Sequence, residues 1–147
     1  MRARILVVDD DALFRAWADD ALAGLGYDLR VAADVQEALA VLREVPVDVV
    51  VADHVMPGTS GLTLLTSMRD HLPGPKRILV SSSTDPALLV EAINQAEVFR
   101  FLPKPCEPNA LRLAVWCAVR DAEREEESMG LAALARESAG IVPLAAG

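Results

Sequence analysis

The feature that most constrains the fold is a regular alternation of short apolar runs with longer segments of helical periodicity. Five apolar runs, rich in β-branched residues, are predicted to be strands: residues 5–8, 28–32, 47–52, 77–81 and 98–102. A helical segment follows each run, and the last helix begins near Glu107 and continues far beyond the others. Because polar residues do not alternate with apolar ones, we expect a parallel sheet covered by helices on both faces.

Residues that favour helix starts follow three of these runs. Asp34 and Ser60 can cap the second and third helices, and Asp85-Pro86 combines a capping carboxylate with a proline in the first turn. In the first helix, apolar spacing predicts one buried face: Leu13, Phe14, Trp17, Ala21 and Leu22. In the last helix, four side chains are predicted to face the sheet: Leu111, Val115, Ala118 and Ala122.

Composition limits the classes of function. The chain has 147 residues and 52% apolar residues, which suits one domain with a full core. No apolar run approaches the roughly 18 residues of a membrane span, and the first run is too short for a signal peptide, so we expect a cytoplasmic protein without a membrane partner. A net charge of −8 argues against nucleic-acid binding by this chain alone. Cys106 and Cys117 do not have zinc-ligand spacing.

Polar residues follow four of the predicted strands. Asp9 and Asp10 come after the first strand, Asp53 after the third, Ser82 after the fourth and Lys104 after the fifth. In an open parallel sheet the carboxyl ends of the strands meet at one edge, where ligands bind. The sequence therefore predicts carboxylates, a hydroxyl and an ammonium group in one site.

This set of groups suits the transfer of a phosphoryl group. Neighbouring carboxylates repel one another unless a cation joins them, and hard oxygen ligands with open positions suit Mg²⁺. Mg²⁺ and an ammonium group can neutralise phosphoryl oxygens, and an aspartate can act as the nucleophile.

Other polar residues near these strand ends are expected to have structural roles only. Asp11 is interpreted as a helix cap, and the hydroxyls of Ser81 and Ser83 are expected to bond to the backbone. His54 is expected to be exposed and not to bind a ligand.

Taken together, the motifs resemble the receiver domain of bacterial two-component response regulators. The resemblance covers about residues 3–119 and rests on these residues: Val7-Val8-Asp9-Asp10-Asp11, Asp53-x-x-Met56-Pro57-Gly58-x-x-Gly61, Ser82 and Lys104-Pro105. It implies a flavodoxin-like (βα)5 fold with strand order 2-1-3-4-5 and an extended C-terminal helix. Residues 1–119 would form the receiver domain, and residues 120–147 a charged helical extension or linker that ends in a loose tail from Gly140.

The resemblance also implies the chemistry. Asp53 would accept a phosphoryl group from a phosphohistidine of a sensor histidine kinase or phosphotransfer protein. Asp9, Asp10 and the backbone carbonyl of Val55 would bind Mg²⁺. The chain would not be an enzyme that turns over a separate substrate, since its chemistry would be limited to Mg²⁺-dependent self-phosphorylation and autodephosphorylation on Asp53.

Three residues would stabilise the phosphoryl group and take part in switching. Ser82 and Lys104 would contact the phosphoryl group, and Phe101 would be the aromatic residue that moves inward with Ser82. Pro105 would follow a cis peptide bond. The phosphoryl group would thereby shift the population of a surface formed by the fourth helix, fifth strand and fifth helix. The sequence departs from the family's pattern at Glu97 and Val98, where small residues are usual.

Two other classes of protein are alternatives to this interpretation. The first is a pseudo-receiver, a protein-interaction module of the same fold that is not phosphorylated. The second is a haloacid-dehalogenase-like enzyme, which Asp9-x-Asp11 mimics. That class has a hydroxyl two residues after its second aspartate, where this chain has Leu13.

The last helix carries a second, outward stripe that includes Leu113, Trp116 and Cys117, followed by a charged segment at residues 120–127. One hypothesis is that this stripe, with the fifth strand, forms a homodimer surface that extends into the charged helix. The other is that Trp116 packs on a neighbouring helix of its own chain.

Overall fold

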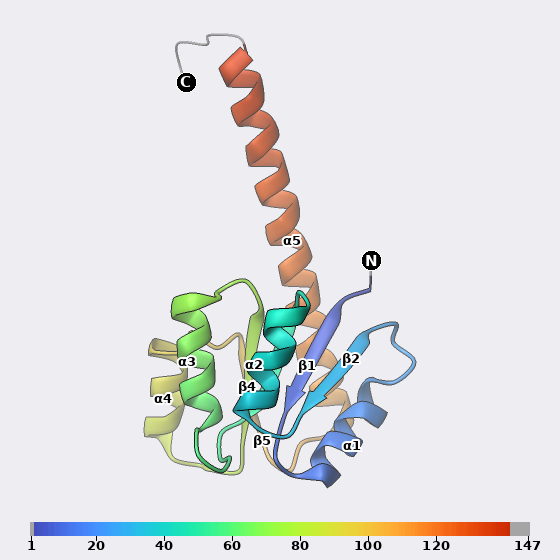
Figure 1. The fold of residues 1–147 in the computed structure, drawn as a ribbon, viewed down its shortest axis with the longest axis vertical. Helices are drawn as coiled ribbons and strands as arrows, with labels where there is room; N and C mark the ends of the chain where they lie inside the picture. The colour runs from blue at the N-terminus through green and yellow to red at the C-terminus, as the bar shows by residue number, and fades with distance from the viewer. Residues whose placement is uncertain (1, 142–147) are drawn as a thin grey trace.

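The computed structural model describes residues 2–141. The strands are β1 (Arg4–Val8), β2 (Asp28–Ala32), β3 (Val49–Asp53), β4 (Lys76–Ser81) and β5 (Arg100–Pro103). The helices are α1 (Ala12–Leu22), α2 (Val35–Glu44), α3 (Gly61–His71), α4 (Pro86–Asn94) and α5 (Pro108–Ile141). All strand pairs are parallel, in the order β2-β1-β3-β4-β5 (Figure 1). This confirms the predicted fold, and the strand boundaries differ from the prediction by at most two residues.

The sheet is buried on both faces, as its apolar strands predict. Leu6 and Val8 point into a core formed with α2, α3 and α4, whereas Ile5 and Val7 point into a second core formed with α1 and α5. All four side chains are at most 1% exposed. A strand between two such cores needs apolar residues at every position, which explains the absence of polar alternation.

The predicted helix caps are confirmed. The Asp34 carboxylate accepts a hydrogen bond from the Glu37 N–H, the Ser60 hydroxyl accepts one from Thr63, and the Asp85 carboxylate accepts one from Ala87. Each cap satisfies a backbone donor that has no partner within its helix.

The prediction for the buried face of α1 is wrong at Leu13, which is 81% exposed. Ala18, Ala21 and Leu22 form the buried face, and Phe14 packs at its margin. Leu13 is rotated by roughly 130° from the centre of this face, because each helical residue turns the chain by about 100°. It therefore lies at the surface, next to the carboxyl edge of the sheet.

A buried arginine supports the turn between α4 and β5. The Arg77 guanidinium donates hydrogen bonds to the carbonyls of Ala96 at 2.9 Å, Pro73 at 3.0 Å and Glu97 at 3.4 Å. Glu97 has φ of +49°, a left-handed conformation that glycine adopts more readily. Glu97 therefore lies in a turn that hydrogen bonds from the buried Arg77 side chain stabilise.

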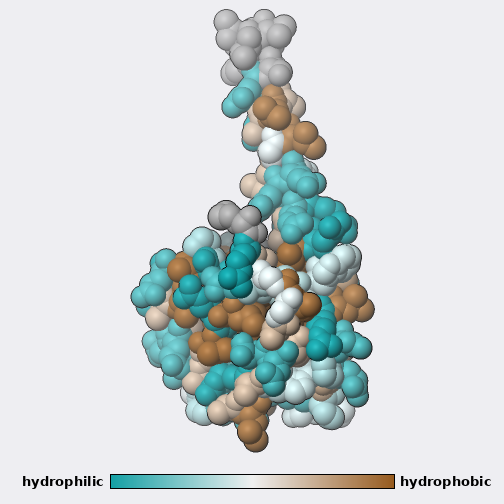
Figure 2. Space-filling model, turned by 90° about the vertical axis from the view of Figure 1, so that its right-hand side faces the viewer, coloured by the Kyte–Doolittle hydropathy of each residue, from teal (hydrophilic) through white to brown (hydrophobic). Residues whose placement is uncertain are grey.

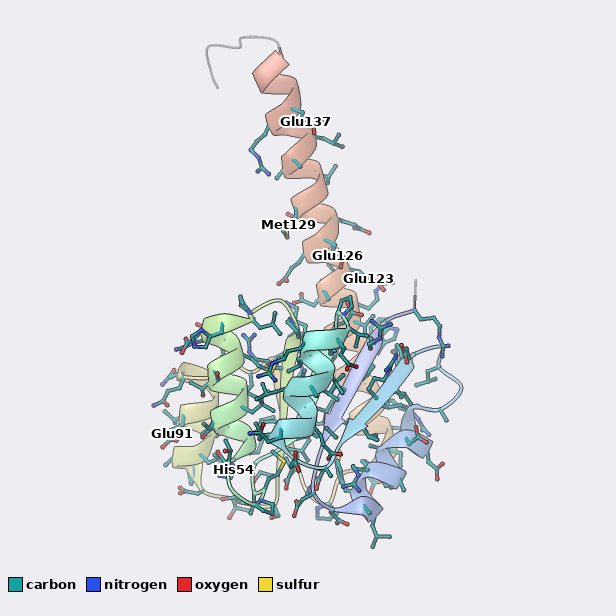
Figure 3. All side chains as sticks on the ribbon, in the orientation of Figure 1. His54, Glu91, Glu123, Glu126, Met129 and Glu137 are labelled. Atoms are coloured by element: carbon teal, nitrogen blue, oxygen red, sulfur yellow. The ribbon has the colours of Figure 1, made fainter. Side chains whose placement is uncertain are left out.

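The last helix has two parts. Leu111, Val115 and Ala118 face the sheet as predicted, whereas Ala122, the fourth residue of the predicted face, is only half-buried. The exposed part then extends well beyond the body, and Figure 3 shows Glu123, Glu126, Met129 and Glu137 projecting from it. α5 continues through Gly140, where a loose tail was predicted, and residues 142–147 lie outside the described residues. Between residues 2 and 141, no helix combines the length and the apolarity that crossing a membrane requires.

Candidate functional site

The carboxyl ends of the strands meet at the lower edge of the sheet in Figure 1, opposite the edge from which the α5 extension leaves. Asp9 follows β1 directly, Asp53 is the last residue of β3, and Lys104 follows β5. The pairing of β3 with β4 and of β4 with β5 aligns these ends. Parallel pairing thus brings residues 9, 53 and 104 to one place.

Three carboxylates gather at this edge. One oxygen each of Asp9, Asp10 and Asp53 lies within 4.8 Å of the others. Asp9 is fully buried and Asp53 is 7% exposed, whereas Asp10 is open to solvent. The Asp9 carboxylate is held in place on one side, because its Oδ1 accepts a 2.8 Å hydrogen bond from the N–H of Asp11.

Lys104 bridges two of these carboxylates. Its Nζ donates to Asp9 Oδ2 at 2.7 Å and lies 3.2 Å from Asp53 Oδ1. The same Nζ is 4.2 Å from the centre of the Phe14 ring, a cation–π contact that no sequence pattern predicts. The Lys104–Pro105 peptide bond is cis.

The pKa values of the site reflect an excess of negative charge. Burial, and then the charge of Asp9, raise the pKa of Asp53 above its ordinary value, although Lys104 opposes this shift. Burial lowers the pKa of Lys104, but hydrogen bonds and charges from Asp9 and Asp53 outweigh it and leave that pKa raised. Lys104 therefore stays charged, and one ammonium group faces three carboxylates. Such a set of hard oxygen ligands fits Mg²⁺.

The backbone after β3 is closed by a tight contact with α3. The N–H of Gly61 donates a 3.0 Å hydrogen bond to the carbonyl of His54. A Cβ atom at Gly61 would lie only 1.9 Å from the Asp53 carbonyl oxygen. The glycine at the end of the Asp53 motif is therefore required by close packing against the candidate acceptor itself.

His54 was predicted to be exposed, and this is wrong. It is half-buried, and its Nδ1 is a buried atom without a hydrogen-bond partner in the described part of the chain. The cause is local, because the N–H of His54 donates to the Val80 carbonyl at 2.9 Å and draws the residue onto the sheet edge (Figure 3).

The remaining hydroxyls and carboxylates near the edge have the structural roles predicted for them. The Asp11 carboxylate caps α1 by accepting from Leu13 at 2.9 Å. The Ser81 hydroxyl is buried and accepts from the N–H of Ser83, whose own hydroxyl accepts from Asp85.

Three predicted site residues lie around the cluster without joining its ion pairs in residues 2–141. Ser82 is exposed, one residue beyond the end of β4, and the side chain of Val55 is 67% exposed. Phe101 is half-buried and packs against the core that contains α4. The structure thus brings Asp9, Asp10, Asp53 and Lys104 together and leaves the others at their margin.

A parallel 2-1-3-4-5 sheet with an acidic cluster and a lysine at its carboxyl edge defines a receiver-like signalling domain. The response regulator receiver domain family matches residues 5–116, and the chain belongs to this family.

Relatives and solved structures agree with this family. The chain is 34% identical over 115 residues to the hydrogenase transcriptional regulatory protein HoxA of Cupriavidus necator, covering 75% of this chain and 23% of HoxA. It is 31% identical over 129 residues to the DNA-binding response regulator MtrA of Mycolicibacterium paratuberculosis, covering 88% of this chain and 56% of MtrA. The signal receiver domain of an HD domain-containing protein from Pseudomonas fluorescens Pf-5 superimposes with a TM-score of 0.82 at 33% identity, covering 86% of this chain and 93% of that one. The chain therefore spans little more than half of MtrA and less than a quarter of HoxA.

Proposed function

We propose that the chain is a response-regulator receiver that accepts a phosphoryl group on Asp53 from a phosphohistidine of a sensor histidine kinase or phosphotransfer protein. One observation carries the proposal: the Asp53 carboxylate ends β3 at 7% exposure, 3.2 Å from the Lys104 ammonium group and beside two further carboxylates. A carboxylate in this position combines a nucleophile with a cation that can stabilise the group it receives.

In the proposed reaction, an Asp53 carboxylate oxygen attacks phosphorus. The new P–O bond replaces the P–N bond of the phosphohistidine, and the imidazole leaves with the electron pair of that bond. Lys104 moves part of its interaction from Asp53 to a phosphoryl oxygen while Asp9 keeps it positioned. Asp9, Asp10, Asp53 and the Val55 carbonyl would hold Mg²⁺, which, when bound, supplies positive charge against the phosphoryl oxygens. Autodephosphorylation reverses the outcome, since water takes the phosphoryl group from Asp53.

The proposed switch uses residues at the margin of the site. Ser82 donates a hydrogen bond to the phosphoryl group, and Phe101 moves inward as the loop after β4 rearranges. Both changes alter the surface formed by α4, β5 and α5, and a partner or a second copy binds the altered surface. The exposed position of Ser82 and the partial burial of Phe101 leave room for this movement. The proposal places the domain in the cytoplasm and gives it no binding of nucleic acid by itself, in keeping with its net charge of −8.

The test is phosphorylation by acetyl phosphate, read by intact mass. Wild type with Mg²⁺ is expected to gain one phosphoryl group, while Asp53→Ala and wild type in EDTA gain none. Asp70→Ala, which removes an exposed carboxylate on α3, is the matched control and should label like wild type. Failure of wild type to gain a phosphoryl group, together with failure to bind beryllofluoride, would support the pseudo-receiver alternative.

A further inference from the structure

The outward face of α5 carries four large apolar side chains in two pairs. Leu113 and Trp116 lie on the body and are 62% and 52% exposed, while Leu131 and Leu134 lie on the extension and are 68% and 61% exposed. Each residue of the second pair follows its counterpart by 18 positions, which is five helical turns and about 27 Å along the axis. The two pairs therefore lie on one line along the helix. We call this line, with Arg120 and Glu127 between the pairs, the outward stripe.

The outward stripe faces away from its own body. The opposite side of α5 packs on the sheet through Leu111, Val115 and Ala118, and Lys76 of β4 binds Asp121 on that inner side at 2.7 Å. Figure 2 shows hydrophobic side chains on the body and again on the upper part of α5, with a hydrophilic stretch between them. These contacts show that the outward stripe lies on the side of α5 that does not pack on the sheet.

The outward stripe is complementary to a reversed copy of itself. Read along the chain, it contains an apolar pair, Arg120, Glu127 and a second apolar pair, and its midpoint falls between residues 123 and 124. Arg120 lies on this face, because its guanidinium is 5.4 Å from the centre of the Trp116 ring. Reversing the helix about that midpoint exchanges Arg120 with Glu127 and one apolar pair with the other.

We propose that the outward stripe binds the same stripe of a second copy of this chain, with the two α5 helices antiparallel. Leu113 then lies opposite Leu134 of the second copy, Trp116 opposite its Leu131, and Arg120 opposite its Glu127. A parallel pair would also match apolar residues, but it would place Arg120 against Arg120 and Glu127 against Glu127. Charge complementarity therefore selects the antiparallel pair and identifies the occupant as a second copy.

The shape of the molecule accommodates this arrangement. Each body lies on the inner side of its own helix, and the midpoint next to Glu123 is close to where α5 leaves the body (Figure 3). The extension of the second copy would run along a groove that borders the stripe and is lined by Leu25, Tyr27, Asn109, Arg112, Leu113 and Trp116. Its Leu131 and Leu134 would cover the apolar walls of that groove. The dimer would therefore bury the exposed apolar residues of both the body and the extension.

Charge exchange in the 147-residue chain tests the orientation by sedimentation equilibrium. Arg120→Glu and Glu127→Arg are each expected to raise the dimer dissociation constant about tenfold, because each places like charges opposite one another at two positions per dimer. The double variant, and an equimolar mixture of the two single variants, should recover wild-type association. In a parallel dimer the wild type already has like charges opposite one another, so the single variants would associate no more weakly than wild type and their mixture would associate more tightly than wild type. Either of these results, or a monomeric wild type at all concentrations, would overturn the proposal.

Apolar truncation and cross-linking test the contacts. Trp116→Ala and Leu134→Ala should each weaken association about tenfold or more, whereas Met129→Ala, which removes a side chain that is 71% exposed and off the stripe, should not change it. In a background without Cys106 and Cys117, Leu113→Cys should form a disulfide with Leu134→Cys when the two variants are mixed. Preferential cross-linking of Leu113→Cys to itself would show a parallel pair and refute the model of association. None of these readouts depends on phosphorylation of Asp53.

Discussion

Replacement of Gly61 by alanine is expected to disturb the candidate acceptor without touching any charged group of the site. An added Cβ would lie 1.9 Å from the Asp53 carbonyl oxygen and 2.7 Å from its carbonyl carbon. Ordinary contacts begin at 3.4 Å, so the start of α3 and the end of β3 must separate by up to the difference, 1.5 Å. Both neighbours are backbone atoms at the end of a buried strand, and they cannot move aside as a flexible side chain would.

The expected magnitude follows from two costs. Overpacking of this kind destabilises a core by about 1–3 kcal/mol. Separation of α3 from β3 also weakens the 3.0 Å hydrogen bond from Gly61 to His54, which contributes about 1 kcal/mol. We therefore expect Gly61→Ala to lower the free energy of unfolding by about 2–4 kcal/mol. Because displacement of a reacting group by about 1 Å can cost a factor of about 100 in rate, phosphorylation of the folded variant should slow by about that factor.

Urea unfolding and the rate of labelling by acetyl phosphate measure the two effects separately. Gly74→Ala is the matched control, because a Cβ at Gly74 meets nothing within 4 Å. The control should be as stable as wild type or slightly more stable, since alanine restricts the unfolded chain. Stability of Gly61→Ala within about 0.5 kcal/mol of the control would refute the packing argument.

Two further predictions concern buried charges. The raised pKa of Asp53 means that the folded state holds this proton more tightly than the unfolded state, so its contribution to stability falls as the pH rises from 3.8 through the folded pKa. In EDTA, Asp53→Asn should therefore be more stable than wild type near neutral pH and lose this advantage in acid, and urea unfolding at both pH values checks the sign. Arg77→Ala should destabilise by about 2–4 kcal/mol, because buried carbonyls that include those of Ala96 and Pro73 lose a charged donor. Arg43→Ala, at an exposed position of α2, is its control in the same assay and should change stability by less than about 0.5 kcal/mol.

The fold could be predicted from sequence because every level of the pattern agreed. Strands without polar alternation required burial on both faces, and caps such as Asp34 and Ser60 marked where helices begin. The error at Leu13 has a simple origin. Periodicity identifies a face only when the neighbouring elements are known, and Leu13 is rotated away from the face that packs on the sheet, whereas Phe14 in the same turn packs at its margin.

The site could be predicted in its residues but not in its contacts. Topology alone brings Asp9, Asp53 and Lys104 to one edge, because parallel strands end on the same side. It does not say that Lys104 bonds to Asp9 at 2.7 Å, or that Phe14 lies under its ammonium group. Those contacts depend on rotamers and on the path of the loop after β5. Burial of His54 could not be predicted for the same reason, since a backbone hydrogen bond to Val80 determines it.

The geometry divides the proposed switch into a fixed part and a responsive part. Asp9 is fully buried and bonded to both Asp11 and Lys104, so these groups already hold their positions before a phosphoryl group arrives. Ser82 follows the end of β4 at the surface, and Phe101 lies on β5, whose register pairs it with Leu79 of β4. A phosphoryl group on Asp53 would add charge where burial already disfavours it, so its oxygens need every available donor. Because Asp9 retains part of the interaction with Lys104, we propose that the exposed hydroxyl of Ser82 supplies a further donor to the phosphoryl group. Recruiting Ser82 would move the β4–β5 edge rather than the β1–β3 centre of the sheet.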